Sequence, residues 1–115
     1  MSIPKPPKPA KLVIGAILQE KSLLPQVMED LVQRFGGLDL ISPWFDFNFT
    51  DYYEAEMGPG LFRRMMACKP LIQQDNLAGI KLLTNGIEKN YVSGDKRRVN
   101  LDPGYLLLER FVLAT

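Results

Sequence analysis

The sequence predicts an α+β domain of the ferredoxin-like type, a βαββαβ sandwich in which an antiparallel sheet carries two helices on one face. Three observations lead to this prediction. Two segments each carry a single apolar stripe at helical spacing, and short apolar runs precede, separate and follow them. A chain of 115 residues also has the length of one domain, and it can bury a core without disulfides or metals.

The first strand is predicted from residues 11–18, a short apolar run with β-branched members. Such a run suits a strand that is buried on both faces. Residues 1–10 before it contain four prolines and two lysines, and proline lacks a backbone donor. We therefore expect a flexible lead-in over residues 1–10 and a single α+β domain over residues 11–115.

The two helices are predicted from apolar spacing. From Leu24 onward, apolar residues recur three, four, seven and eleven positions later, which places them on one helical face. Ser22 is the expected cap of this helix, and Gly36–Gly37 is its expected end. A second helix is expected over residues 77–90, with Asp75 as its cap.

The remaining strands are predicted from apolar runs between turn residues. Phe45, Phe47 and Phe49 alternate with polar residues, as in a half-buried strand whose rings face the core. Asp102–Pro103–Gly104 is expected to form a turn. The predicted extended segments are 38–49, 61–72, 99–101 and 105–115. Because the chain stops within an apolar run, either the last strand completes the sheet or the chain is a fragment of a longer protein.

Composition and charge exclude several functions. The net charge of +1 gives no overall field that would attract nucleic acid or an anionic membrane. Nucleic-acid binding is also disfavoured because the aromatic residues that an RNA-binding sheet exposes are expected to be buried here. The chain has no histidine, which excludes Ser-His-Asp triads, Cys-His pairs and histidine zinc sites within it. No apolar run approaches the length of a membrane span.

The single cysteine, Cys68, cannot form a disulfide within the chain, and this usage fits a reducing cytoplasm. Because Cys68 lies in an apolar run, we interpret it as a core residue and not as a nucleophile. Neither the phosphate loop GxxxxGK(S/T) nor the dinucleotide motif GxGxxG occurs in the sequence.

A first polar cluster lies within residues 46–60, followed by Arg63. Its carboxylates, hydroxyls and flexible glycine turns are suited to holding a metal ion or a polar ligand. The structural alternative is that Thr50 or Asp51 caps a short helical turn while the tyrosines pack with their hydroxyls in water. The candidate ligand-binding residues of this region are Asp46, Thr50, Asp51, Tyr52, Tyr53, Glu54, Glu56 and Arg63.

A second polar cluster lies within residues 97–105. Arg98, Asn100 and Asp102 share one face of an extended strand, because side chains repeat every second residue. They are candidates for binding an anion or carboxylate through the fork of Arg97 or Arg98. The structural alternative is an Arg–Asp pair that holds a turn. The sequence leaves open whether this cluster meets the first one.

These two motifs, FTDYYEAEMGPG at residues 49–60 and RRVNLDPGYL at residues 97–106, resemble an uncharacterised bacterial domain family. The shorter pieces at 11–15 and 80–85 resemble it as well. Members of that family have no assigned function and are often labelled GTP-binding protein. The resemblance implies a bacterial, cytoplasmic protein, and family members run further, with additional strands after the last segment.

We therefore expect a non-enzymatic ligand-binding or protein-interaction domain. Its expected partner is a second copy of the chain, in a homodimer, or a small anionic or phosphorylated ligand. The alternative is a nucleotide- or phosphate-binding protein, or a metal-dependent enzyme, that uses the carboxylate and arginine clusters. The sequence names no cofactor and assigns no catalytic residue.

Overall fold

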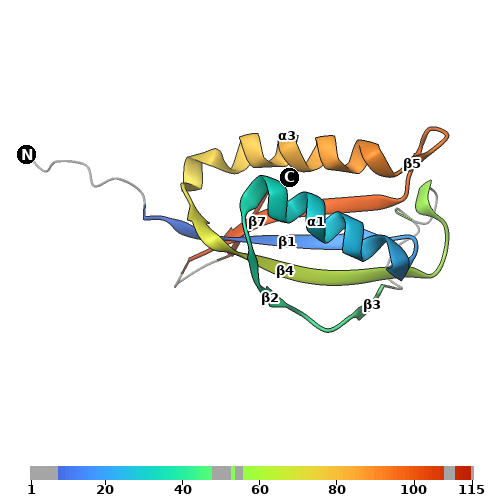
Figure 1. Ribbon diagram of the computed structural model, residues 1–115, viewed down its shortest axis with the longest axis horizontal. Coiled ribbons are helices and arrows are strands. Elements are labelled where there is room, and N and C mark those ends of the chain that lie inside the picture. Colours follow the sequence, from blue (N-terminus) through green and yellow to red (C-terminus); the bar gives the residue numbers. More distant parts are fainter. Residues whose placement is uncertain (1–7, 48–52, 54–55, 108–110, 115) are drawn as a thin grey trace, which may run out of the picture.

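The computed structural model describes residues 8–47, 53, 56–107 and 111–114. Its strands are β1 (Ala10–Leu18), β2 (Leu38–Ile41), β3 (Phe45–Phe47), β4 (Leu61–Ile72), β5 (Val92–Ser93), β6 (Lys96–Arg97), β7 (Val99–Leu106) and β8 (Phe111–Leu113). Its α-helices are α1 (Leu24–Phe35) and α3 (Leu77–Glu88), and its 3-10 turns are η1 (Lys21–Leu23), η2 (Gln74–Asn76) and η3 (Lys89–Tyr91) (Figure 1).

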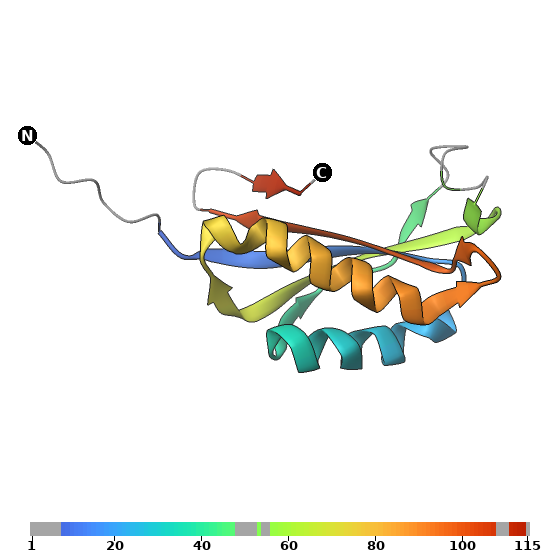
Figure 2. The same ribbon diagram turned by 90° about the horizontal axis from the view of Figure 1, so that it is seen from above.

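The main sheet is antiparallel, with the strand order β2-β4-β1-β7-β8 and with β3 pairing the other end of β4. The apolar strand β1 lies in its centre, paired with β4 on one side and β7 on the other. Both helices lie on the same face of this sheet (Figure 2). The predicted α+β fold with an antiparallel sheet and two helices is confirmed. The chain order is not a plain βαββαβ, because β3, the β5–β6 hairpin and β8 are added.

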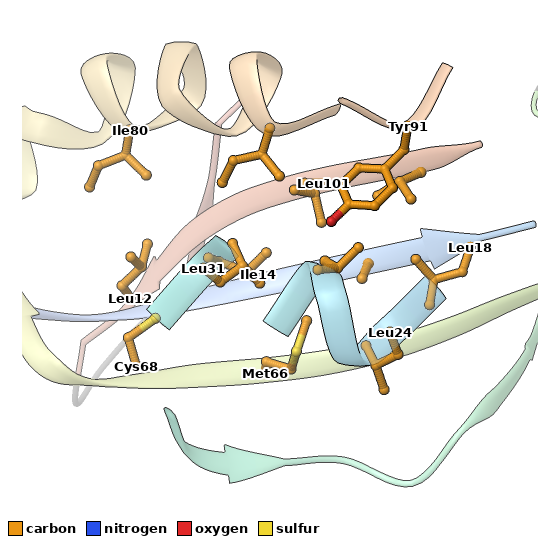
Figure 3. Packing of buried hydrophobic residues seen from close by; sticks show 14 residues of the cluster. Leu12, Ile14, Leu18, Leu24, Leu31, Met66, Cys68, Ile80, Tyr91 and Leu101 are labelled. Carbon is orange, nitrogen blue, oxygen red and sulfur yellow. The ribbon is translucent and has the colours of Figure 1, made fainter. Parts of the chain in front are cut away.

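The core lies between the sheet and the two helices (Figure 3). Alternate residues of β1 from Leu12 to Leu18 point into it and are fully buried. They meet Val27 and Leu31 of α1, and Ile80 of α3 lies in the same cluster. Burial of each large aliphatic side chain contributes roughly 1.5–3 kcal/mol, so this layer dominates the stability of the fold.

Both helices begin differently from the prediction. The expected caps, Ser22 and Asp75, do not cap, because each lies inside a 3-10 turn that precedes its helix. The Ser22 hydroxyl donates instead to the Glu20 carboxylate at 3.4 Å. The predicted end of α1 is confirmed. Gly36 has a φ of 87°, and a Cβ there would lie 2.6 Å from the Pro70 ring, so glycine is required on both counts.

The expected turn at Asp102–Pro103–Gly104 is wrong, because β7 runs straight through it. The Pro103 carbonyl points away from β1 and accepts the Ala114 N–H at 3.0 Å. The nitrogen of Pro103 points to the same side as its carbonyl, so the missing N–H costs no hydrogen bond between β7 and β1. A Cβ on Gly104 would lie 2.6 Å from the Val112 carbonyl, so glycine allows β8 to approach. Pro103 and Gly104 therefore both fit within β7.

The face of the sheet opposite the helices carries exposed apolar side chains. Strand pairing places Leu40, Ala67, Val13, Gly104 and Leu113 in one row across it. Leu40 is 62% exposed and Leu113 is 46% exposed. We call this surface the open face of the sheet.

The phenylalanine pattern of the 38–49 segment was interpreted incorrectly. Phe45 pairs with Arg63 on the open face and is 45% exposed, so its ring is not in the core. At Phe45 the open face is exposed to solvent, so the apolar side of this strand does not mark the core there. Phe49 lies outside the described residues, as does the side chain of Phe47.

Candidate functional site

Glu56 and Arg97 bring the two predicted polar motifs together. Arg97 Nε donates to Glu56 Oε2 at 2.9 Å and Arg97 Nη2 donates to Glu56 Oε1 at 3.0 Å, which makes a bidentate pair. The backbone N–H of Arg97 also donates to Glu56 Oε2, at 2.8 Å. The β5–β6 hairpin presents Arg97 in this way, so a single carboxylate fixes both its backbone and its side chain.

The contacts continue from Arg97 along β7. Arg97 Nη1 donates to Asn100 Oδ1 at 2.7 Å, and Asn100 Nδ2 donates to Asp102 Oδ2 at 2.9 Å. Asp102 Oδ1 lies 3.5 Å from Nζ of Lys81 on α3. The predicted placement of Asn100 and Asp102 on one face is confirmed by their direct hydrogen bond.

Glu88, in the last turn of α3, closes the group from the other side. Its Oε1 accepts from Arg97 Nη1 at 3.5 Å, and its Oε2 accepts the backbone N–H of Leu101 at 2.6 Å. Lys81 Nζ donates to the Leu101 carbonyl at 3.1 Å. Two side chains of α3 therefore satisfy both backbone groups of Leu101. We call the set Glu56, Lys81, Glu88, Arg97, Asn100 and Asp102 the Arg97 network.

Electrostatics within the Arg97 network hold its charges in place. The hydrogen bonds from the Arg97 side chain and backbone lower the pKa of Glu56 below its ordinary value. The Glu56 hydrogen bond in turn raises the pKa of Arg97, against the effect of burial. Three carboxylates meet two cations here, and no buried side-chain nitrogen or oxygen in the described part of the chain lacks a partner. The network can therefore fix the hairpin, β7 and α3 relative to one another.

The other predicted site residues do not join this network. Arg98 turns to Gln19 instead, donating from Nε to Oε1 at 3.1 Å, and it lies 3.6 Å from Glu20. Tyr53 packs beside Ile17 in a small apolar cluster on the open face. Arg63 is exposed on β4. The residues Thr50, Asp51, Tyr52 and Glu54, and the side chain of Asp46, lie outside the described residues.

The burial of Cys68 and the spacing of the described acidic side chains bear on a possible thiol or metal centre. Burial raises the pKa of the Cys68 thiol to about 11, with smaller effects from Lys11 and Asp39. A thiol of this kind is protonated at neutral pH, and its interpretation as a core residue is confirmed. Among the residues that the structure describes, no three histidine, cysteine or acidic side chains gather as a metal site would require.

Sequence reasoning missed a second group of contacts, around the single tryptophan. Trp44 and Phe62 meet edge to face with ring centres 6.1 Å apart. Lys21 Nζ lies 5.3 Å from the centre of the Trp44 ring and 5.0 Å from that of Phe62. Arg64 Cζ lies 4.8 Å from the centre of the Trp44 ring. We call these four residues the Trp44 cluster. They come from three separate segments, so no local pattern pointed to them.

Sequence reasoning also missed Glu88 as a network residue. The sequence signal for Glu88 was its position, four residues after buried Thr84 on the apolar stripe of α3. An acidic residue on a buried stripe needs a partner.

Comparison with protein families gives one match. A family described as a domain of unknown function (DUF4416) matches residues 8–115. The chain belongs to this family. The resemblance to an uncharacterised domain family is thereby confirmed, and the family itself assigns no activity. Comparisons with curated proteins and with solved structures found no match. In the described part of the chain, no helix is both long enough and apolar enough to span a bilayer.

Proposed function

We propose that this member of the DUF4416 family is a non-enzymatic interaction domain that pairs with a second copy of itself through the open face of the sheet. The observation that carries the proposal is the apolar row from Leu40 to Leu113 across that face. The two ends of this row, Leu40 and Leu113, are exposed, while Ala67 between them is 2% exposed. Leu71 and Leu106, which pair with Lys11 on the same face, add further exposed apolar side chains. Exposed apolar side chains gathered on one face mark an interaction surface. We further propose that the four main strands form a ferredoxin-like sheet, which is supported by the central position of β1 and β4.

The charges around this row favour a second copy as the partner. Lys11 and Asp102 lie on the open face beside the row, and each is already paired within the chain, Lys11 with Asp39 and Asp102 with Lys81. A two-fold dimer brings identical surfaces together, so any unpaired charge on them would repel its own copy. Lys11 and Asp102 avoid this cost because each is neutralised within the chain. Arg63 at the end of the open face is also engaged within the chain.

The polar side chains give less support for a metal-dependent or catalytic function. The described acidic residues of the Arg97 network are bound to arginine, lysine or backbone donors, so a metal or substrate would have to displace those partners. A metal-dependent enzyme that uses Asp46, Asp51 and Glu54 stays a prediction, because the side chains of these residues are not described. The same holds for a GTP ligand.

Light scattering after size exclusion tests the proposal. We expect the chain to elute as a dimer at micromolar concentration. Leu40→Glu places a charge at the most exposed end of the apolar row and should give monomers that remain folded. Leu82→Glu is the matched control, since Leu82 is 71% exposed on α3, away from the open face, and should leave the dimer intact.

Two results would overturn the proposal. One is a wild-type monomer throughout the micromolar range. The other is a dimer that survives Leu40→Glu while Leu82→Glu disrupts it, which would move the interface to the helices.

A further inference from the structure

The Trp44 cluster holds two cations without a paired carboxylate. Lys21 and Arg64 contact the rings of Trp44 and Phe62, and within the described residues neither lies in an ion pair. Four other cations of the described residues do have carboxylate partners: Lys11, Lys81, Arg97 and Arg98. Two like charges on one indole repel each other, so among the described side chains this spot carries an excess of positive charge.

The start of α1 adds to this positive potential. Lys21 opens η1, which leads directly into α1, and neither element has an acidic residue in its first turn or a side-chain cap. The N-terminal end of a helix carries a partial positive charge. Glu20 is the nearest acid in sequence, but its carboxylate accepts from Ser22 and lies 3.6 Å from Arg98. It is therefore engaged elsewhere.

The cluster is held in shape before any ligand arrives. Ser42, two residues before Trp44, exchanges two hydrogen bonds with Met65 of β4, each 2.9 Å long. Its carbonyl accepts from Arg64 Nε at 2.7 Å, and its hydroxyl donates to the Pro43 carbonyl at 2.8 Å. These contacts fix the loop between β2 and β3 against the strand that carries Arg64. A preformed site loses little entropy on binding.

We propose that the Trp44 cluster is a binding site for a phosphate monoester. With Nε occupied by Ser42, Arg64 keeps both terminal nitrogens for an end-on pair of hydrogen bonds to phosphate oxygens. Lys21 supplies the second charge. A phosphate monoester carries roughly −1.5 to −2 at neutral pH, which matches the two cations, whereas a carboxylate carries a single charge. The half-buried rings of Trp44 and Phe62 line the side of the site.

Because Trp44 is the only tryptophan, its fluorescence reports directly on this site. The experiment titrates the full chain with inorganic phosphate at constant ionic strength, with acetate as the carboxylate arm. We expect a saturable change in emission at millimolar phosphate and a response to acetate that is weaker by about tenfold. Lys21→Gln and Arg64→Gln should each weaken phosphate binding by about tenfold or more. The unfolding temperature of each variant confirms that it is folded.

Lys69→Gln is the matched control, because it removes one exposed positive charge from β4 outside the cluster. It should leave phosphate binding unchanged. The proposal is overturned by any of three results. The first is that the wild type gives no saturable response, and the second is that it responds equally to phosphate and acetate. The third is that Lys69→Gln and Arg64→Gln weaken phosphate binding equally. The last would mean a general charge effect. The site is separate from the open face, so dimer formation can fail without affecting this result.

Discussion

Arg97 and Arg64 are the same residue type in two opposite settings. The side chain of Arg97 donates four hydrogen bonds, two of them to the carboxylate of Glu56, and it is enclosed by groups of its own chain. Arg64 donates one hydrogen bond, to a carbonyl, and otherwise rests on an indole. The comparison shows that an arginine with four of its five donors used joins segments together, while one with both terminal nitrogens left over is available to a ligand.

The largest expected effect is the loss of the least exposed charge in the Arg97 network. Glu88 is 5% exposed and accepts from both Leu101 N–H and Arg97. Glu88→Ala leaves a backbone donor and part of a guanidinium without a partner, and it should cost about 2–3 kcal/mol of unfolding free energy. Urea unfolding measures this. Glu88→Gln keeps an acceptor and should cost less, and an equal loss in both variants would contradict the hydrogen-bond explanation.

A matched pair of substitutions addresses the comparison itself. Arg97→Lys removes the bidentate contact with Glu56 and should cost about 1–2 kcal/mol. Arg64→Lys keeps the charge near Trp44 and loses one hydrogen bond, so it should cost roughly 0.5–1 kcal/mol. Both are measured by urea unfolding in the same buffer. If Arg64→Lys proved the more damaging, Arg64 would be the structural arginine and the comparison would be reversed.

The smallest effect is a difference in acid sensitivity. The folded-state pKa of Glu56 lies below its ordinary value of 4.5, so its stabilisation is present above about that pH. It is lost as the pH falls through the folded-state pKa. Glu56→Gln should therefore have a flatter stability profile than wild type in this acid range. Thermal unfolding between neutral and acid pH measures the profiles, and parallel slopes would show that Glu56 gains nothing from Arg97.

Local patterns predicted the elements well. The strand at 61–72 has the bounds of β4, and the stripe from Leu24 matches α1, because both patterns are set by neighbours in sequence. Asp102–Pro103–Gly104 was misinterpreted because the same residues suit a turn or a strand edge. Only the neighbouring strands decide between these two outcomes.

The candidate site was less predictable than the fold. Asn100 and Asp102 could be placed together from strand alternation alone. The bond between Glu56 and Arg97 spans 41 residues, and that between Lys11 and Asp39 spans 28, so both depend on how the strands are ordered. The contacts of the Trp44 cluster depend on that order too. Sequence alone had no means of choosing Arg97 over Arg98 as the arginine that reaches the first motif.

The two contacts that α3 makes with Leu101 have a consequence for assembly. An unpaired stretch of edge strand is a template on which another chain can add its own strand and begin to aggregate. Glu88 and Lys81 occupy the donor and the acceptor of Leu101, and β8 occupies the edge further along β7. This margin is closed to strand addition by the chain's own side chains and backbone. A second chain that added a strand at Leu101 would first have to displace these contacts.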